Sequence, residues 1–186
     1  SPAVIWAWSG METTLFAFAW VLAWALHLNE YEQNKWPIGS ALATFAAGLL
    51  HPEGVLIGIV LGLAWLWPFA KSRLKKAVAY WGIAYGLFGL YWLWRWYYFG
   101  FFFPNTFYAK VGGGALLHAG LVYVGLSALS ALLPLVLVYL LVREVKNFRQ
   151  WPRWLWIGLG LTLILVLYVI YVGGDYFSFS RFLLPA

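Results

Sequence analysis

The sequence contains no cysteine, and charged residues make up only 10% of its 186 residues. The lack of cysteine excludes disulfides, thiolate chemistry and cysteine-ligated metals. The scarcity of charge is far from the composition of soluble domains, where about a quarter of the residues are charged. Hydrophobic residues make up 64% of the chain and form continuous runs, whereas barrel strands would alternate apolar and polar residues. We therefore expect an all-α, polytopic transmembrane helical bundle.

The apolar runs predict where the membrane helices lie. A helix needs about 20 residues to cross the hydrocarbon core of a bilayer. With the shorter stretch described next, we expect about six membrane helices in one domain that includes residues 1–186. The longer runs cover residues 11–28, 55–69, 77–97, 115–142 and 154–172.

A shorter apolar stretch, residues 37–50, ends at the sequence His51-Pro52-Glu53-Gly54. Pro52 disfavours helical geometry at His51, and Gly54 loosens the backbone further. Residues 37–69 are too many for one perpendicular span. Two helices that turn at Pro52 are the better interpretation, and a single broken helix is the alternative.

The basic residues indicate the orientation, because Lys and Arg are enriched in short cytoplasmic loops. Lys35 lies in a predicted polar loop, residues 29–35, and two larger clusters follow later runs. An even number of crossings separates the three groups, so all can face the cytoplasm. They account for the net charge of +6 without nucleic-acid binding. The clusters are Lys71, Arg73, Lys75 and Lys76, and Arg143, Lys146, Arg149 and Arg153.

On this orientation, four polar segments share the external side. In the first, Ser9 and Glu12 have the spacing of a helix capping box, and Glu12 is alternatively a carboxylate that contacts a sugar or a cation. In the second, Glu53 beside His51 is costly to bury without a partner or a substrate. The His51–Glu53 spacing does not suit a helical metal pair, and no third ligand accompanies it, so no metal site is predicted there.

In the third segment, residues 95–110, an aromatic run is interrupted by Pro104-Asn105-Thr106. Arg95 and Lys110 flank the run as two cations that could hold a phosphate, and Asn105 could contact a sugar. Alternatively, the aromatics lie in the headgroup layer and Arg95 snorkels there.

In the fourth segment, residues 173–181, Asp175 and Arg181 could form a structural ion pair. Otherwise Asp175 contacts sugar hydroxyls and Arg181 holds a lipid phosphate. His27 and His118 lie within or beside apolar helices, and we interpret both as structural.

These motifs occur in an order that resembles bacterial polytopic GT-C glycosyltransferases related to the mycobacterial terminal arabinofuranosyltransferases. The series is Ser-Gly-Met-Glu-Thr, Pro-Glu-Gly, Tyr-Phe-Gly with Pro-Asn-Thr-Phe-Tyr-Ala-Lys, and Gly-Gly-Asp before Arg-Phe-Leu-Leu-Pro. It spans nearly the whole chain. His51 departs from the pattern, which commonly has Arg before Pro-Glu-Gly, and imidazole would make phosphate binding pH-dependent.

The resemblance implies an enzyme of the bacterial cytoplasmic membrane with its active site on the external side. It would transfer a sugar from a polyprenyl-phosphate donor to a glycan, lipid or protein acceptor. The family's catalytic aspartate lies upstream of the Ser-Gly-Met-Glu-Thr motif, so we expect the base before Ser1 and this chain to be an internal piece. No cofactor is assigned, and the need for a divalent cation stays open. We expect donor-phosphate contacts from Arg181, Lys110, Arg95 and His51, and sugar or acceptor contacts from Glu12, Glu53, Asp175 and Asn105.

Two other classes of function remain. A transporter or flippase of lipid-linked saccharide would need ionisable residues along a path through the helices, whereas the polar groups here cluster at one end. A non-catalytic membrane scaffold would use the aromatic motifs only to bind lipid or a partner.

Overall fold

The computed structural model is all-helical in the part of the chain that it describes, residues 13–67, 70–102, 116–130, 139 and 150–174, and this confirms the all-α part of the expected fold class. The helices there are α2 (Thr13–Glu32), α3 (Ile38–Leu50), α4 (Gly54–Trp65), α5 (Lys71–Phe99), α7 (Leu117–Ser130) and α9 (Arg153–Val172).

Two connections differ from the expectation. Residues 29–32, predicted as part of a loop, form the last turn of α2, and the basic cluster that begins at Lys71 forms the first turns of α5. Polar side chains at a helix end do not break the helix when tertiary contacts hold its last turn. The predicted end of α2 and the predicted start of α5 were therefore wrong, because charged residues were taken as the sign of a loop.

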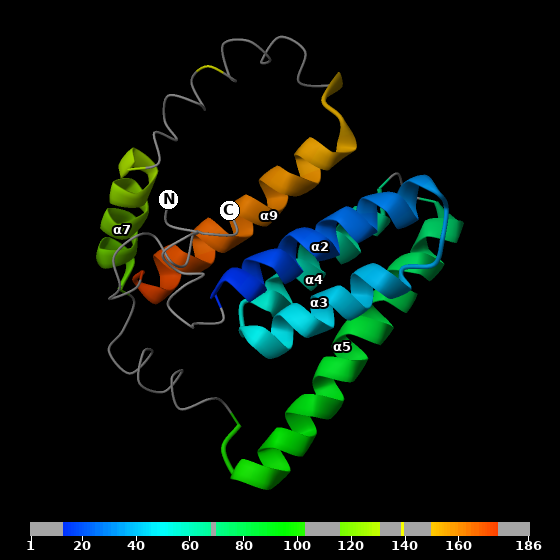
Figure 1. The fold of residues 1–186 in the computed structure, drawn as a ribbon, viewed down its shortest axis with the longest axis horizontal. Helices are drawn as coiled ribbons and strands as arrows, with labels where there is room; N and C mark the ends of the chain where they lie inside the picture. The colour runs from blue at the N-terminus through cyan, green and yellow to red at the C-terminus, as the bar shows by residue number, and fades with distance from the viewer. Residues whose placement is uncertain (1–12, 68–69, 103–115, 131–138, 140–149, 175–186) are drawn as a thin grey trace.

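The turn between α3 and α4 confirms the hairpin at Pro52. His51 ends α3 with extended backbone angles of φ −150° and ψ 136°, the conformation that a following proline favours. Gly54 then begins α4 so close to the end of α3 that a Cβ atom on it would collide with the backbone of Ala47 and Gly48. The two helices return side by side as one antiparallel pair (Figure 1).

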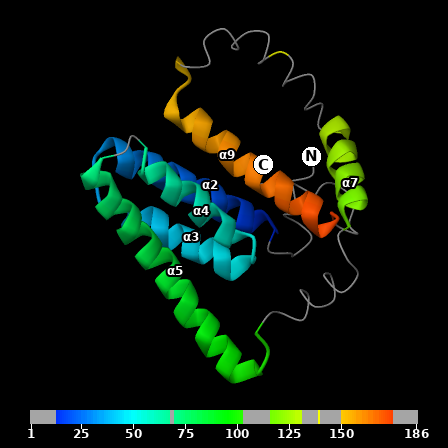
Figure 2. The ribbon, with the colours of Figure 1, turned by 180° about the vertical axis from the view of Figure 1, so that it is seen from behind.

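Around this pair, α2 packs on α3 and α4, α5 covers the other side of the pair, and α9 packs on α4 (Figure 1). Seen from behind, α7 lies beside the C-terminal end of α9 (Figure 2), where Gly120 meets the backbone of Ile170. The core joins alanines of α2 and α3 to larger side chains of α4 and α9. Its most buried members include Ala23, Ala47, Ile57, Leu61, Trp65 and Leu161.

One face of α4 carries a glycine at every fourth position, Gly54, Gly58 and Gly62. This spacing puts the three on one side of the helix and lets neighbouring helices approach its backbone. The Trp81 indole of α5 donates a hydrogen bond to the Gly58 carbonyl at 3.0 Å, and the Tyr85 hydroxyl donates one to the Val55 carbonyl at 2.9 Å. The small residues thus allow aromatic donors of α5 to reach the α4 main chain.

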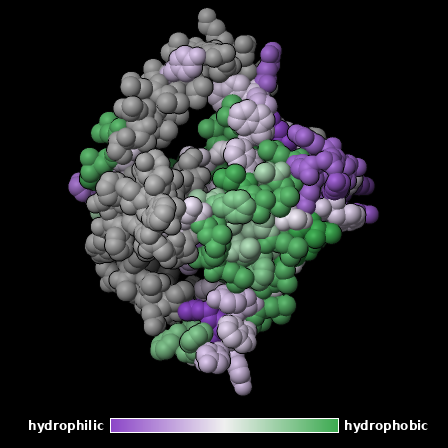
Figure 3. Space-filling view, viewed as in Figure 1, coloured by the Kyte–Doolittle hydropathy of each residue, from purple (hydrophilic) through white to green (hydrophobic). Residues whose placement is uncertain are grey.

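Helix length bears on the membrane prediction. Among the described helices, only α9, with 20 residues, is both long and apolar enough to cross a membrane by that measure. α3 and α4 have 13 and 12 residues. They are about 20 Å long, against a hydrocarbon core of about 30 Å. Hydrophobic residues form a broad central band, with hydrophilic residues at the right edge and in a smaller patch at the bottom of the view (Figure 3).

We predict that Gly54→Ala lowers the free energy of unfolding by about 1–3 kcal/mol, because the new methyl group meets backbone atoms that cannot move aside. The measurement is thermal unfolding of the purified protein in detergent. Gly82→Ala is the matched control, because a Cβ atom at Gly82 of α5 meets nothing within 4 Å. It should leave stability unchanged or raise it by up to about 1 kcal/mol. Equal effects of the two changes would contradict the close packing at Gly54.

Candidate functional site

Two predicted site residues meet at the α3–α4 turn. The Nδ1 atom of His51 lies in hydrogen-bond contact with Oε2 of Glu53, and the two form an ion pair when the imidazole is protonated. The His51 side chain is 20% exposed and that of Glu53 only 6%, so the carboxylate is the more buried of the two groups. The His51 ring also packs on Phe16 of α2, with 5.2 Å between ring centroids. Contacts with both Glu53 and Phe16 therefore hold the imidazole in place.

Arg95, the third predicted residue that the structure describes, lies farther along α5. Phe88 is the residue of α5 that packs against Gly48 near the hairpin turn. Arg95 follows it by seven residues, or about 10 Å along a helix. Its guanidinium lies 5.6 Å from the Trp92 ring centroid and 5.8 Å from that of Phe99. The described residues therefore place Arg95 in an aromatic setting of its own and not in contact with the His51–Glu53 pair.

The other predicted site residues lie outside the described part of the chain, and their roles stay predictions. They are Glu12, Asn105, Lys110, Asp175 and Arg181. Within the described ranges, no three His, Asp or Glu side chains are grouped so as to hold a metal ion.

At the opposite end of the bundle the structure forms a group that the sequence did not predict. Tyr31 of α2 has the Arg73 guanidinium 3.8 Å and the Arg153 guanidinium 3.4 Å from its ring centroid. The Lys76 ammonium lies 5.5 Å from the centroid of Trp65, which is also buried there. We call Tyr31, Trp65, Arg73, Lys76 and Arg153 the cation–aromatic cluster.

The cluster is tied to the backbone at the ends of α2 and α4. Arg153 donates to the Trp67 carbonyl at 2.7 Å and to the Ala64 carbonyl, and the Tyr31 hydroxyl donates to the same Trp67 carbonyl at 2.9 Å. Lys76 donates at 2.6 Å to both the main-chain oxygen and Oδ1 of Asn34. Burial, together with Arg73 nearby, lowers the pKa of Lys76, which lies just before the predicted span 77–97. From the sequence, Arg73, Lys76 and Arg153 were interpreted only as orientation signals. In the structure they also join helices α2, α4, α5 and α9.

A buried carboxylate holds α2 and α3 together beside this cluster. Glu30, only 7% exposed, accepts hydrogen bonds from the Gly39 amide at 2.7 Å, the Ser40 amide at 3.2 Å and the Ser40 hydroxyl at 2.5 Å. These amides belong to the first turn of α3, where a helix has unpaired donors and favours negative charge. Thr44, one turn later, exchanges a hydrogen bond of 2.7 Å with the Tyr80 hydroxyl of α5.

The surroundings of His27 support its interpretation as a structural residue. The ring is fully buried, packs edge-on against Trp65 at 5.0 Å, and has no hydrogen-bond partner for either nitrogen among the described residues. His118 is exposed on α7. Its structural role stays a prediction.

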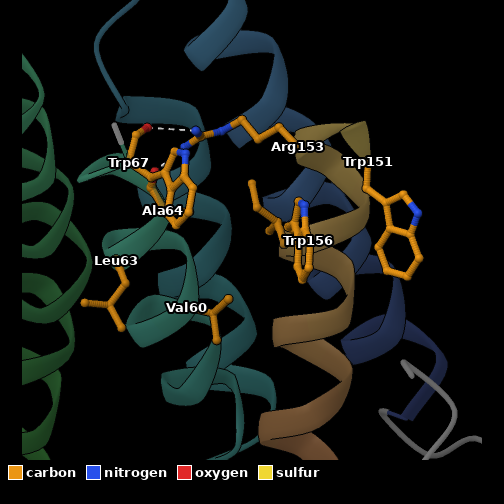
Figure 4. A pocket seen from close by; sticks show the side chains of 8 residues that line it. Val60, Leu63, Ala64, Trp67, Trp151, Arg153 and Trp156 are labelled. Carbon is orange, nitrogen blue, oxygen red and sulfur yellow. Dashed lines mark hydrogen bonds between the residues drawn. The ribbon is translucent and has the colours of Figure 1, made fainter. Parts of the chain in front are cut away.

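A groove of about 560 Å³ opens between α4 and α9 next to the cluster. Arg153 reaches across its upper end toward α4, and the two walls run down from there (Figure 4). Apolar side chains line it on both sides, and Trp67 at its mouth is 73% exposed. Its lining includes Val60, Leu63 and Trp67 on one side and Trp151, Arg153 and Trp156 on the other. We call it the α4–α9 groove.

Comparisons with known proteins leave the family open. No family model matches the chain, and no curated protein or solved structure is similar to it. The functional assignment therefore depends on the residues and their geometry.

We predict that Glu30→Gln lowers the free energy of unfolding by about 1–3 kcal/mol, because an amide replaces a buried charge that accepts several hydrogen bonds. Glu32→Gln is the matched control, since Glu32 lies two residues later on α2 and is exposed. It should change stability by less than about 0.5 kcal/mol. Thermal unfolding in detergent measures both. If the two variants unfold alike, Glu30 does not hold the start of α3.

Proposed function

We propose that the chain is part of a multi-pass, GT-C-like glycosyltransferase of the bacterial cytoplasmic membrane. The enzyme would transfer a sugar from a polyprenyl-phosphate donor to a glycan, lipid or protein acceptor of the cell envelope on the external side. The sequence resemblance suggests this reaction.

One structural observation supports the proposed location of the site. The His51–Glu53 pair and the basic residues of the cation–aromatic cluster lie at opposite ends of the hairpin formed by α3 and α4. Lys and Arg favour the cytoplasmic side, so this polarity supports an external position for the pair. A hydrophobic surface beside a hydrophilic end, as Figure 3 shows for the described residues, is also what a membrane-embedded bundle requires.

The proposed chemistry concerns the donor phosphate, which leaves as the sugar is transferred. Cations that meet its growing negative charge lower the barrier. The contact with Glu53 would fix the orientation of the His51 ring, so that the imidazole can face the phosphate where guanidinium is usual. Because Glu53 is largely buried, we assign it to positioning His51. The remaining proposed donor contacts are Arg95, Lys110 and Arg181, and the proposed sugar or acceptor contacts are Glu12, Asn105 and Asp175.

We predict that Lys110→Ala and Arg181→Ala each reduce sugar transfer by about 10²-fold, the usual loss when one donor that stabilises a developing anion is removed. The measurement is transfer from a labelled polyprenyl-phosphate sugar by the full-length protein in membrane vesicles. Lys71→Ala removes the same charge from the exposed start of α5 and is the matched control.

Full activity of both variants at normal protein levels would defeat these two assignments. Movement of the labelled lipid across the vesicle membrane without sugar transfer would favour the flippase alternative. An inactive full-length protein that binds lipid would favour the scaffold.

We predict that cysteines introduced at Lys71 and at Phe101 react with membrane-impermeant maleimide from opposite sides of the membrane. Phe101 lies two residues beyond the end of α5, and the cysteine-free sequence gives this assay no background from the chain itself. Labelling of intact cells and of inverted vesicles makes the measurement. Position 101 should react in cells and position 71 only in inverted vesicles. Labelling of both positions from one side would overturn the proposed crossing by α5.

A further inference from the structure

We propose that the cation–aromatic cluster and the α4–α9 groove together bind an anionic phospholipid of the cytoplasmic leaflet. The phosphodiester would lie against Arg73 and Arg153, and one acyl chain would fill the groove. This site lies at the end of the bundle opposite His51 and Glu53. The proposal requires that the protein is inserted in the membrane, but it does not depend on the sugar-transfer reaction.

The charge of the cluster points to an anion. Its three cations have no carboxylate within ion-pair distance among the described residues, where Glu30 is engaged with α3 and Glu53 with His51. One guanidinium nitrogen of Arg73, Nη1, and one of Arg153, Nε, also have no hydrogen-bond acceptor there, whereas the other two nitrogens of Arg153 donate to carbonyls of Trp67 and Ala64. Concentrated positive charge is normally compensated by a partner, and a phosphodiester offers both a negative charge and several acceptor oxygens.

The apolar α4–α9 groove favours a lipid over a free anion as the ligand. Arg153 belongs to both features, because its guanidinium stacks on Tyr31 while its side chain closes the upper end of the groove (Figure 4). Below it, the walls are formed by side chains such as Val60, Leu63 and Ile157. An apolar channel that leads away from a cationic mouth matches the shape of a lipid. Basic pockets between membrane helices on the cytoplasmic side take anionic headgroups in this way.

The tryptophans at the mouth support the same occupant. Trp67, Trp151 and Trp156 surround the groove near Arg153. Their amphipathic rings favour the boundary between headgroups and acyl chains. Cations, indoles and hydrocarbon walls thus follow one another in the order in which a phospholipid presents phosphate, glycerol and chain.

The test is native mass spectrometry of the full-length protein after exposure to an equal mixture of phosphatidylglycerol and phosphatidylcholine. We expect preferential retention of phosphatidylglycerol, and an affinity about tenfold lower in Arg73→Gln, which corresponds to about 1.4 kcal/mol. The Arg73 side chain donates no hydrogen bond to the backbone among the described residues, and the hydrogen bond from its backbone amide to Ala70 is kept in the variant, so the variant should still fold. Lys75→Gln removes the same charge from the same, exposed part of α5 and should retain the lipid like the parent protein.

Leu63→Trp tests the groove separately, because Leu63 lines it and is 54% exposed. This variant should also retain less phosphatidylglycerol, although the cations remain. Equal retention of the two lipids by the parent protein would overturn the proposal, as would identical losses in Arg73→Gln and Lys75→Gln. Displacement of the lipid by excess inorganic phosphate, with no effect of Leu63→Trp, would show an anion site without a place for the acyl chain and would likewise overturn it.

Discussion

The backbone contact between α3 and α4 at Gly54 is the constraint on which the other features depend. It fixes the hairpin so tightly that no side chain fits between the two helices at the turn. The same spacing repeats at Gly58 and Gly62, which lie against Tyr85 and Trp81 of α5. Ile57, Leu61 and Trp65 follow these glycines by three residues each, so they form a neighbouring stripe of α4 that joins the core with α2 and α9. The hairpin turn and the packing of α4 against α5, α2 and α9 depend on these two adjacent stripes of small and large residues.

The two ends of the hairpin differ in how their charges are balanced. At the turn, the Glu53 carboxylate is in hydrogen-bond contact with His51, two residues away, and the His51 ring packs on Phe16. At the other end, Glu30 is balanced by the amides at the start of α3, which leaves the nearby cations to aromatic rings and carbonyl oxygens. An end whose charges are already paired suits a preorganised site. An end with surplus positive charge suits contact with an anionic surface.

The parts of this architecture that were predictable from sequence are those set by local chemistry. The helical class follows from continuous apolar runs, the hairpin from Pro52, and the meeting of His51 and Glu53 from their separation of two residues. The roles of Glu30 and the cation–aromatic cluster were not predictable, because they arise from tertiary packing. Glu30 reaches amides nine and ten residues away, and Arg153 reaches Tyr31 across more than a hundred residues. In sequence, Arg153 is indistinguishable from an ordinary loop cation, and nothing marks Tyr31 as its partner.

The lengths of the helices place a further constraint on the proposed reaction. α3 is about 20 Å long and shares its starting level with the end of α2, to which Glu30 ties it. If that end lies at the inner membrane surface, the turn at His51 lies about 10 Å short of the outer edge of a 30 Å hydrocarbon core. The part of α5 beyond Phe88 continues past the turn with Trp94, Trp96 and Tyr98 exposed. Under the proposed function, a lipid phosphate would therefore meet Arg95 nearer the surface before it could approach His51. The order of these two residues along α5 and the hairpin would then make them successive contacts for one headgroup rather than a single clamp.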